Sequence, residues 1–97
     1  MPLFALHATD RPGALALRLE HSGAHRAYIE TEGGRDIKVI LSGPLQSDDG
    51  TSAIGSLFIF EAPDRATVET FAKADPFARY NVWESINIAR FHRREGA

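Results

Sequence analysis

Apolar and polar residues follow two different spacings along this chain, and each spacing predicts one type of element. Four apolar segments of strand length are rich in β-branched and aromatic residues or end at turn residues, as buried strands do. They cover residues 3–8, 36–42, 53–61 and 83–92. Gly43-Pro44 is expected to end the second strand, and the polar stretch after it predicts a hairpin to the third strand.

Residues 14–32 are expected to form a helix, because Ala, Leu, Arg and Glu dominate this segment. Steps of three and four residues separate two stripes on that helix. One stripe is mostly apolar and contains Leu15, Leu19, Ser22 and Ile29. The other is polar or aromatic and contains Arg18, His21, His25 and Tyr28. Gly33-Gly34 is expected to end the helix, and Gly23 allows a break or a close contact within it.

A second helix is expected to begin at Pro63, because proline suits the first helical position, and to continue to about Lys73. Asp75-Pro76 stops this helix, since the residue before a proline disfavours the α region. Residues 77–82 then form a connector of undefined conformation before the last strand.

The order of these elements is β-α-β-β-α-β, which predicts an α+β fold of ferredoxin-like type in one domain over residues 1–97. Two helices cover one face of such a sheet, and nothing in the chain covers the other. The strands carry large apolar residues that make an uncovered face unfavourable in water: Phe4, Leu6, Phe58, Phe60, Ile86 and Ile88. We therefore expect a homodimer, which can assemble further, in which two sheets pack face to face.

The composition excludes several classes of function. The 97 residues carry a net charge of −2, whereas nucleic-acid binding needs a basic surface. The chain has no cysteine, which excludes disulfides, thiolate nucleophiles and cysteine-ligated metal centres. No apolar run approaches the roughly 20 residues that span a bilayer, and the first residues lack the basic segment of a signal peptide. We expect a cytoplasmic protein without membrane or nucleic-acid partners.

His21 and His25 are four residues apart, so they share one face of the first helix. This spacing can supply two zinc ligands, but a site needs a third ligand, and the glutamate of the HExxH motif is absent. The alternative is one histidine that points inward and one that is exposed. We expect neither a metal site nor a cofactor.

Several short motifs are individually typical of plain turns and helix caps, but together they occur in the order found in one family. These motifs are Asp10, Arg18, Ala24-His25, Gly43-Pro44-Leu45, Ala74-Asp75-Pro76-Phe77 and the segment from Asn81 to Phe91. In this order and at this spacing, the chain resembles the YCII-related (YciI-like) family over nearly its whole length. The segment 33–38 departs from the family pattern, which leaves the start of the second strand undefined.

The resemblance implies a dimeric α/β barrel and an active site built around a histidine–aspartate pair. By position, this catalytic pair is His25 and Asp75. The substrate-binding residues near it would be Asp10, Arg18, Gly43 and Pro44. A few relatives in the family are linked to dehydrochlorination of chlorinated aromatic breakdown products, and the fold resembles that of muconolactone-isomerase-type enzymes.

A histidine–aspartate pair is suited to proton transfer. A carboxylate that accepts a hydrogen bond from one imidazole nitrogen fixes the tautomer, and the other nitrogen can then take or give a proton near neutral pH. No serine lies in a nucleophile-elbow pattern. We therefore favour a lyase or isomerase that acts on a small, partly apolar carboxylate or ring compound. Arg18 would bind a substrate carboxylate or hold Asp10 in a salt bridge.

Two other functions stay open. The same dimer could bind a small ligand without catalysis or serve as an accessory module, with the His–Asp pair as a structural element. A cofactor-free oxygenase of the dimeric-barrel type would need an electron-rich substrate held against Trp83 or Tyr80. A cavity of about 300 Å³ or more with His25 facing into it favours the enzyme, whereas a pair sealed in the core favours the module.

Overall fold

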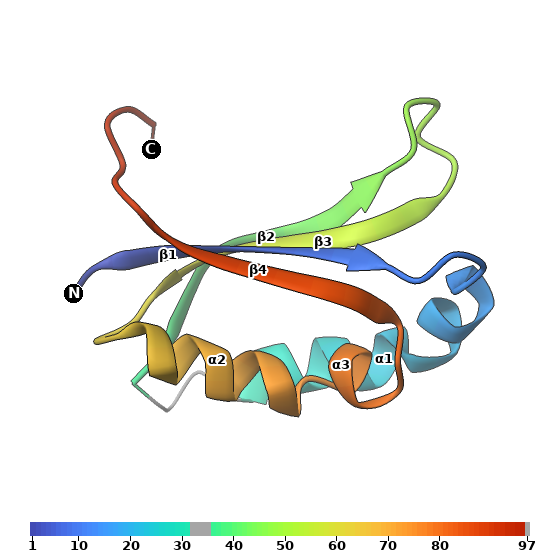
Figure 1. The fold of residues 1–97 in the computed structure, drawn as a ribbon, viewed down its shortest axis with the longest axis horizontal. Helices are drawn as coiled ribbons and strands as arrows, with labels where there is room; N and C mark the ends of the chain where they lie inside the picture. The colour runs from blue at the N-terminus through green and yellow to red at the C-terminus, as the bar shows by residue number, and fades with distance from the viewer. Residues whose placement is uncertain (32–35, 97) are drawn as a thin grey trace.

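One antiparallel sheet and three helices make up the fold. In this computed structural model, which describes residues 1–31 and 36–96, the elements are β1 (Leu3–Asp10), α1 (Leu15–Thr31), β2 (Lys38–Gln46), β3 (Ala53–Glu61), α2 (Arg65–Ala74), α3 (Pro76–Arg79) and β4 (Trp83–Phe91). The strands are ordered β2-β3-β1-β4, and each neighbouring pair is antiparallel. The helices lie together on one side of the sheet (Figure 1). The predicted α+β, ferredoxin-like βαββαβ fold is confirmed.

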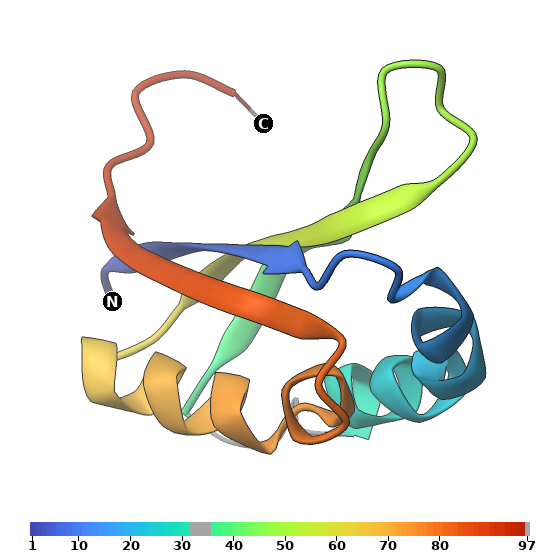
Figure 2. The ribbon, with the colours of Figure 1, turned by 45° about the vertical axis from the view of Figure 1, so that its right-hand side comes forward.

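The core lies between the sheet and the helix layer. Alternate residues of a strand point to opposite faces, and the inward set of β1 and β3 is apolar. The helices run across the underside of the twisted sheet and close this layer (Figure 2). The largest buried side chains from strands and helices meet there: Phe4, Leu6, Phe58, Phe60, Val68, Phe71, Phe77 and Trp83.

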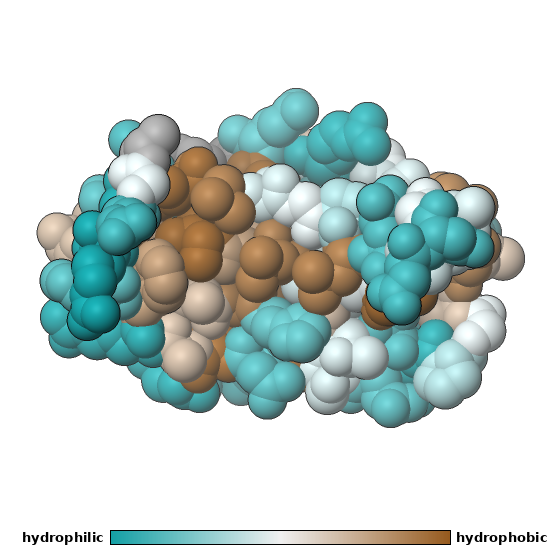
Figure 3. Space-filling model, turned by 90° about the horizontal axis from the view of Figure 1, so that it is seen from above, coloured by the Kyte–Doolittle hydropathy of each residue, from teal (hydrophilic) through white to brown (hydrophobic). Residues whose placement is uncertain are grey.

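The apolar residues predicted for the uncovered face of the sheet belong to the covered face, so this assignment was wrong. Phe4, Leu6, Phe58 and Phe60 are buried, and Ile88 and Ile86 pair with Leu6 and Ala8 on the same face. Strand alternation separates the two sets of side chains, but it does not reveal which set the helices cover. The uncovered face carries a second apolar set that includes Leu3, Ala5, Leu41, Leu57 and Ile59. Figure 3 looks down on this face, where hydrophobic side chains form a band.

Strand β2 extends through Gly43-Pro44, where the sequence predicts its end. The strand begins at Lys38 and continues to Gln46, and Pro44 pairs with Ser56 of β3. β2 is an edge strand of the sheet. A proline is tolerated in an edge strand, because a backbone N–H that points away from the sheet has no hydrogen-bond partner in the sheet to lose. The prediction that Gly43-Pro44 is a turn after the strand was therefore wrong.

The connector predicted over residues 77–82 begins with a short helix, α3. Asp75 ends α2 and caps α3, and its Oδ1 accepts a hydrogen bond of 2.8 Å from the backbone N–H of Phe77. Pro76 occupies the first turn of α3, where its missing N–H costs nothing. The residue before a proline favours extended backbone, and Asp75 has φ −63° and ψ 134°. The Asp75-Pro76 stop is thus a corner between two helices.

Helix α1 turns its polar stripe toward the sheet. Arg18 is only 6% exposed, whereas Leu15 and Leu19 are 40% and 67% exposed. A helix normally buries its apolar stripe, so this orientation needs polar partners beneath the helix. The hydrogen bonds of the candidate site supply those partners.

Glycine does not interrupt α1. The helix is continuous past Gly23, and a Cβ built on this residue meets nothing within 4 Å. The break or close contact predicted there is therefore absent. The predicted helix end at Gly33-Gly34 lies outside the described residues.

The described helices are short. α1, the longest, has 17 residues, and none of the described helices is long and apolar enough to cross a bilayer. The cytoplasmic location stays a prediction.

Candidate active site

His25 and Asp75 are 50 residues apart in sequence and joined in space. Nδ1 of His25 lies 2.8 Å and 2.9 Å from the two carboxylate oxygens of Asp75. An ionised carboxylate only accepts hydrogen bonds, so with Asp75 ionised Nδ1 carries a hydrogen, and in the neutral imidazole Nε2 then holds the lone pair. No described residue forms a hydrogen bond with Nε2. The pair therefore presents an imidazole nitrogen that is free to exchange a proton.

The local fold explains why Asp75 can be almost completely buried. Its side chain is 1% exposed, against 18% for His25. A buried carboxylate needs hydrogen-bond donors, and Asp75 receives one from the backbone N–H of Phe77 and one from His25. Capping α3 thus also orients the carboxylate toward α1.

The ring of Phe77 supports the site. It lies parallel to the imidazole of His25, with the ring centroids 4.0 Å apart and an angle of 7° between the planes. The guanidinium carbon of Arg18 is 4.6 Å from the centroid of the same ring, within the range of a cation–π contact. The indole of Trp83 meets Phe77 edge-on at 5.9 Å. Aromatic packing therefore limits the movement of both polar side chains.

Arg18 and Asp10 form a second buried pair. Nη1 of Arg18 lies 3.0 Å from each carboxylate oxygen of Asp10, and the two side chains are 8% and 6% exposed. Burial raises the pKa of Asp10 above its ordinary value, and the attraction of the Arg18 guanidinium opposes that rise. Of the two roles that the sequence left open for Arg18, the structure contains the salt bridge with Asp10.

Ser56 links this pair to the aromatic cluster. Its Oγ accepts a hydrogen bond of 3.0 Å from Nη2 of Arg18 and one of 3.2 Å from Nε1 of Trp83. Ser56 is 2% exposed and lies on the inward face of β3. The serine therefore fixes a cation from α1 and an indole from β4 at one point of the sheet.

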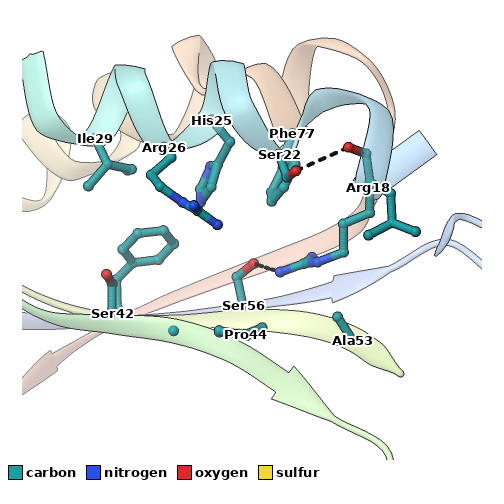
Figure 4. A pocket seen from close by; sticks show the side chains of 13 residues that line it. Arg18, Ser22, His25, Arg26, Ile29, Ser42, Pro44, Ala53, Ser56 and Phe77 are labelled. Atoms are coloured by element: carbon teal, nitrogen blue, oxygen red, sulfur yellow. Dashed lines mark hydrogen bonds between the residues drawn. The ribbon is translucent and has the colours of Figure 1, made fainter. Parts of the chain in front are cut away.

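A cavity of about 330 Å³ lies between α1 and the strands β2 and β3. Apolar side chains, including Ile29, Phe58 and Phe77, make up part of its wall. Its polar lining residues are Arg18, Ser22, His25, Arg26, Ser42 and Ser56, and Gly43 and Pro44 complete the β2 side. Figure 4 shows His25 and Arg18 reaching from α1 toward the sheet, with Ser56 opposite them. The cavity is large enough for a small ring compound.

The chain shares this fold and length with known proteins. Residues 2–92 match the YCII-related domain. The chain belongs to the YCII-related domain family. The structure is also similar to that of 5-chloro-2-hydroxyhydroquinone dehydrochlorinase (TftG) from Burkholderia phenoliruptrix AC1100, in complex with 2,5-dihydroxybenzoquinone. The two sequences are 30% identical, 93% of each chain is covered, and the TM-score is 0.81.

Structures with lower sequence identity are similar to this YCII-related domain in fold only. A variant of SnoaB, a cofactor-independent oxygenase from Streptomyces nogalater, is 13% identical with a TM-score of 0.54, covering 97% of this chain and 93% of its own. The C-terminal domain of the MgtC protein from Mycobacterium tuberculosis is 11% identical with a TM-score of 0.56, covering 100% and 95%. No curated protein matches the sequence.

The residues predicted for the site of this YCII-related domain divide into two layers. Four of them line the cavity: Arg18, His25, Gly43 and Pro44. Asp10 and Asp75 lie behind Arg18 and His25 and are not lining residues. The predicted roles of all six in catalysis and substrate binding stay predictions.

Tyr80 and Trp83 do not line the cavity. Trp83 is 5% exposed and belongs to the core, whereas the ring of Tyr80 stacks on His21 with centroids 4.0 Å apart. His21 and His25 therefore have different partners on the same helix. Within residues 1–31 and 36–96, no cluster of three or more metal-ligating side chains contains them.

Sequence reasoning missed Ser56. The signal was available, because strand alternation puts Ser56 on the same face as Phe58 and Phe60. A serine in an otherwise apolar inward set needs a hydrogen-bond partner, and such a residue is a candidate for a site.

Proposed function

We propose that this protein is a small-molecule lyase or isomerase in which His25 transfers the proton and Asp75 orients and stabilises the imidazole. One observation carries the proposal: the His25–Asp75 hydrogen bond of 2.8 Å lies at the wall of a cavity of about 330 Å³. A structural His–Asp pair needs no such cavity. The nitrogen opposite Asp75 remains available to a bound ligand.

The proton transfer follows from the hydrogen bonding. Nε2 takes a proton from the ligand, and the imidazolium that forms is stabilised by the negative charge of Asp75. The electron pair of the broken bond then forms a new double bond and expels a leaving group, or it takes up a proton at another ligand atom. The first outcome is elimination and the second is isomerisation. Such general acid–base catalysis contributes about 10²–10⁴-fold to a rate.

Two features favour a small oxygen-bearing ring compound as the ligand. The cavity combines the aromatic walls Phe58 and Phe77 with hydroxyl and cationic groups. The 30% identical relative that covers 93% of the chain is a dehydrochlorinase, and its complex contains 2,5-dihydroxybenzoquinone. A dehydrochlorination releases chloride and one proton, and His25 would accept that proton.

The second candidate is a module that binds the same class of ligand without turnover. It is favoured by the double role of Asp75, which caps α3 as well as binding His25. An oxygenase function has less support. The similarity between this chain and SnoaB extends to the fold alone, and neither Tyr80 nor Trp83 lines the cavity.

The experiment that separates these functions incubates the protein with 5-chloro-2-hydroxyhydroquinone and follows chloride release and ligand binding in parallel. Chloride release above the uncatalysed rate, with a linear dependence on protein concentration, supports the lyase. Saturable binding of this compound and of 2,5-dihydroxybenzoquinone without turnover of either supports the module. Absence of binding for a wider set of ring compounds, lactones and small acids would overturn both candidates.

We further propose that two copies of the chain pack through the uncovered face of the sheet to form the homodimer. That face carries apolar side chains, such as Leu57 and Ile59, which a partner would remove from water. Light scattering after size exclusion should give twice the chain mass at micromolar concentration. Ile59→Lys should shift the mass toward the monomer, whereas Leu17→Lys, at an exposed position of α1, should not. A monomeric mass for the unsubstituted protein contradicts the proposal.

A further inference from the structure

The two arginines that line the cavity differ in their partners. Arg18 is 6% exposed, and its charge is compensated by Asp10, whose two carboxylate oxygens each lie 3.0 Å from Nη1. The second terminal nitrogen of Arg18, Nη2, donates to Ser56 at 3.0 Å. Arg26 is exposed and lines the same cavity, but it forms neither an ion pair nor a hydrogen bond with any residue in the part of the chain that the structure describes. The guanidinium of Arg26 is therefore available to a ligand.

No acidic side chain of the cavity wall neutralises Arg26. The described residues that line the cavity include neither aspartate nor glutamate. Asp75 is 1% exposed and lies behind the wall, where its oxygens are bonded to His25 and to the backbone N–H of Phe77. Glu30 follows Arg26 by one turn of α1, a spacing that permits a salt bridge, but the two side chains form none. An unpaired cation at the wall of a partly apolar cavity attracts an anionic ligand.

We propose that Arg26 binds a carboxylate of the ligand and thereby selects ring compounds that carry one. A guanidinium offers two parallel N–H donors in one plane, which match the two oxygens of a carboxylate. Figure 4 shows Arg26 and His25 extending from the same part of α1 toward the sheet, whereas Arg18 reaches Ser56 further along the helix. A carboxylate bound to Arg26 would therefore hold the ligand in the part of the cavity that His25 lines.

A carboxylate in the ligand narrows the substrate class of the proposed enzyme, so this step rests on the proposed function. A ring compound without a carboxylate can use the aromatic walls and the hydroxyl groups, but it leaves Arg26 unpaired. A ring carboxylate adds charge-assisted hydrogen bonds, which are roughly twice as strong as neutral ones. The preferred substrate would therefore carry a carboxylate, which 5-chloro-2-hydroxyhydroquinone, the compound named for the 30% identical dehydrochlorinase, lacks.

Calorimetric titration with 2,5-dihydroxybenzoate and with its uncharged amide, 2,5-dihydroxybenzamide, tests the role of Arg26 without any need for turnover. The unsubstituted protein should bind the carboxylate about tenfold more tightly than the amide, the size of one hydrogen bond to a charged group. Arg26→Gln removes the charge, keeps a good helix former and should abolish this preference. Arg26→Lys keeps the charge without the planar fork and should retain part of it. Arg79→Gln removes the same charge from an exposed arginine of α3 that does not line the cavity, and it should leave the preference unchanged.

The outcomes separate the role of Arg26 from the proposed function. Equal affinity of the unsubstituted protein for the two probes overturns the selection for a carboxylate and leaves the proposed function intact. A preference that persists in Arg26→Gln, or that is lost equally in Arg79→Gln, overturns the contact with Arg26. A preference that depends on Arg26, without turnover of any ring carboxylate, supports the contact and contradicts the catalysis instead. If neither probe binds the unsubstituted protein, the aromatic ligand class is wrong, and the role of Arg26 is overturned with it.

Discussion

Two buried carboxylates stand behind the wall of one cavity, and each holds a different nitrogen-bearing partner. Asp75 binds the imidazole of His25 at 2.8 Å, and Asp10 binds the guanidinium of Arg18 at 3.0 Å. Both partners line the cavity and both contact the ring of Phe77. The two pairs share one architecture, in which an inner carboxylate supports an outer group on α1.

The pairs differ in whether the outer group can lose its proton. An imidazole changes its charge between about pH 5 and 8, whereas a guanidinium stays charged at all pH values that proteins tolerate. The His25 pair is therefore suited to proton transfer, and the Arg18 pair is suited to fixing geometry, including the position of the Ser56 hydroxyl. The same arrangement of residues can support two different tasks because only the outer group changes.

The largest expected effect comes from removing the exchangeable group. His25→Ala should lower kcat for chloride release by about 10²–10⁴-fold, because no other group takes its place at Asp75. His21→Ala is the matched control, since His21 lies one turn earlier on α1 and stacks on Tyr80 outside the cavity. Steady-state kinetics of both variants provide the measurement. Full activity in His25→Ala would falsify the catalytic assignment.

The second largest effect is a loss of stability when the salt bridge between Arg18 and Asp10 is broken. Arg18→Met leaves Asp10 buried without its cation, which should lower the free energy of unfolding by about 3–5 kcal/mol. Combining it with Asp10→Asn should recover part of that loss, because the uncompensated charge is then gone. Urea unfolding of the single and double variants measures this coupling. A double variant that is less stable than Arg18→Met shows that the charge is not the cause.

Asp75 should have a smaller effect on stability than the Arg18 pair. Asp75→Ala removes the cap of α3 and the partner of His25, and we expect a loss of about 1–3 kcal/mol in the free energy of unfolding. Asp75→Asn keeps an acceptor for the Phe77 N–H and should lose less. Asp64 caps α2 from an exposed position, so Asp64→Ala is a control that removes a cap alone. Equal losses for Asp64→Ala and Asp75→Ala would mean that the His25 bond adds nothing to stability.

The smallest expected effect is that the carboxyl groups of Asp49 and Asp10 ionise in different ranges of acidic pH. Hydrogen bonds from Ser47 and Thr51 lower the pKa of Asp49 from 3.8 to about 2, whereas burial raises the pKa of Asp10. The contribution of Asp49 to stability is therefore present above pH 3.8 and lost as the pH falls toward 2. Asp10 has the opposite sign, so its contribution decreases as the pH rises from 3.8 through its raised pKa. Carbon-13 titration of both carboxyl groups should find Asp49 ionising first on the way up from low pH, and the reverse order contradicts the assignment.

The sequence predicted the order of the elements, because helix and strand spacings are local signals. It did not predict that β2 continues through Pro44, since a proline is acceptable only at the edge of a sheet and the edge is decided by the pairing of distant strands. Local sequence patterns also could not predict which face of the sheet the helices cover. Both faces of β1 and β3 carry apolar residues, so Phe4 and Phe58 could not be assigned from alternation alone.

The candidate site was predictable in part. The partners His25 and Asp75 came from a family resemblance, because no local rule joins residues 50 positions apart. Arg18 and Asp10 could be listed as candidates, but their mutual salt bridge depends on how α1 lies against the end of β1. Ser56 was visible as a polar residue in an apolar inward set, and its two donors, Arg18 and Trp83, come from elements that only the tertiary fold brings together.

Asp75 serves the architecture as well as the candidate chemistry, and this has a consequence for the evolution of the family. A relative without the proposed activity would still be expected to keep an aspartate at this corner, because the side chain of Asp75 caps α3 where α2 ends. His25 lies within α1 and caps neither α2 nor α3. Position 25 would therefore be free to accept other residues once the proposed proton transfer was no longer selected. Variation at position 25, more than at position 75, should therefore separate active members of the family from those that retain only the scaffold.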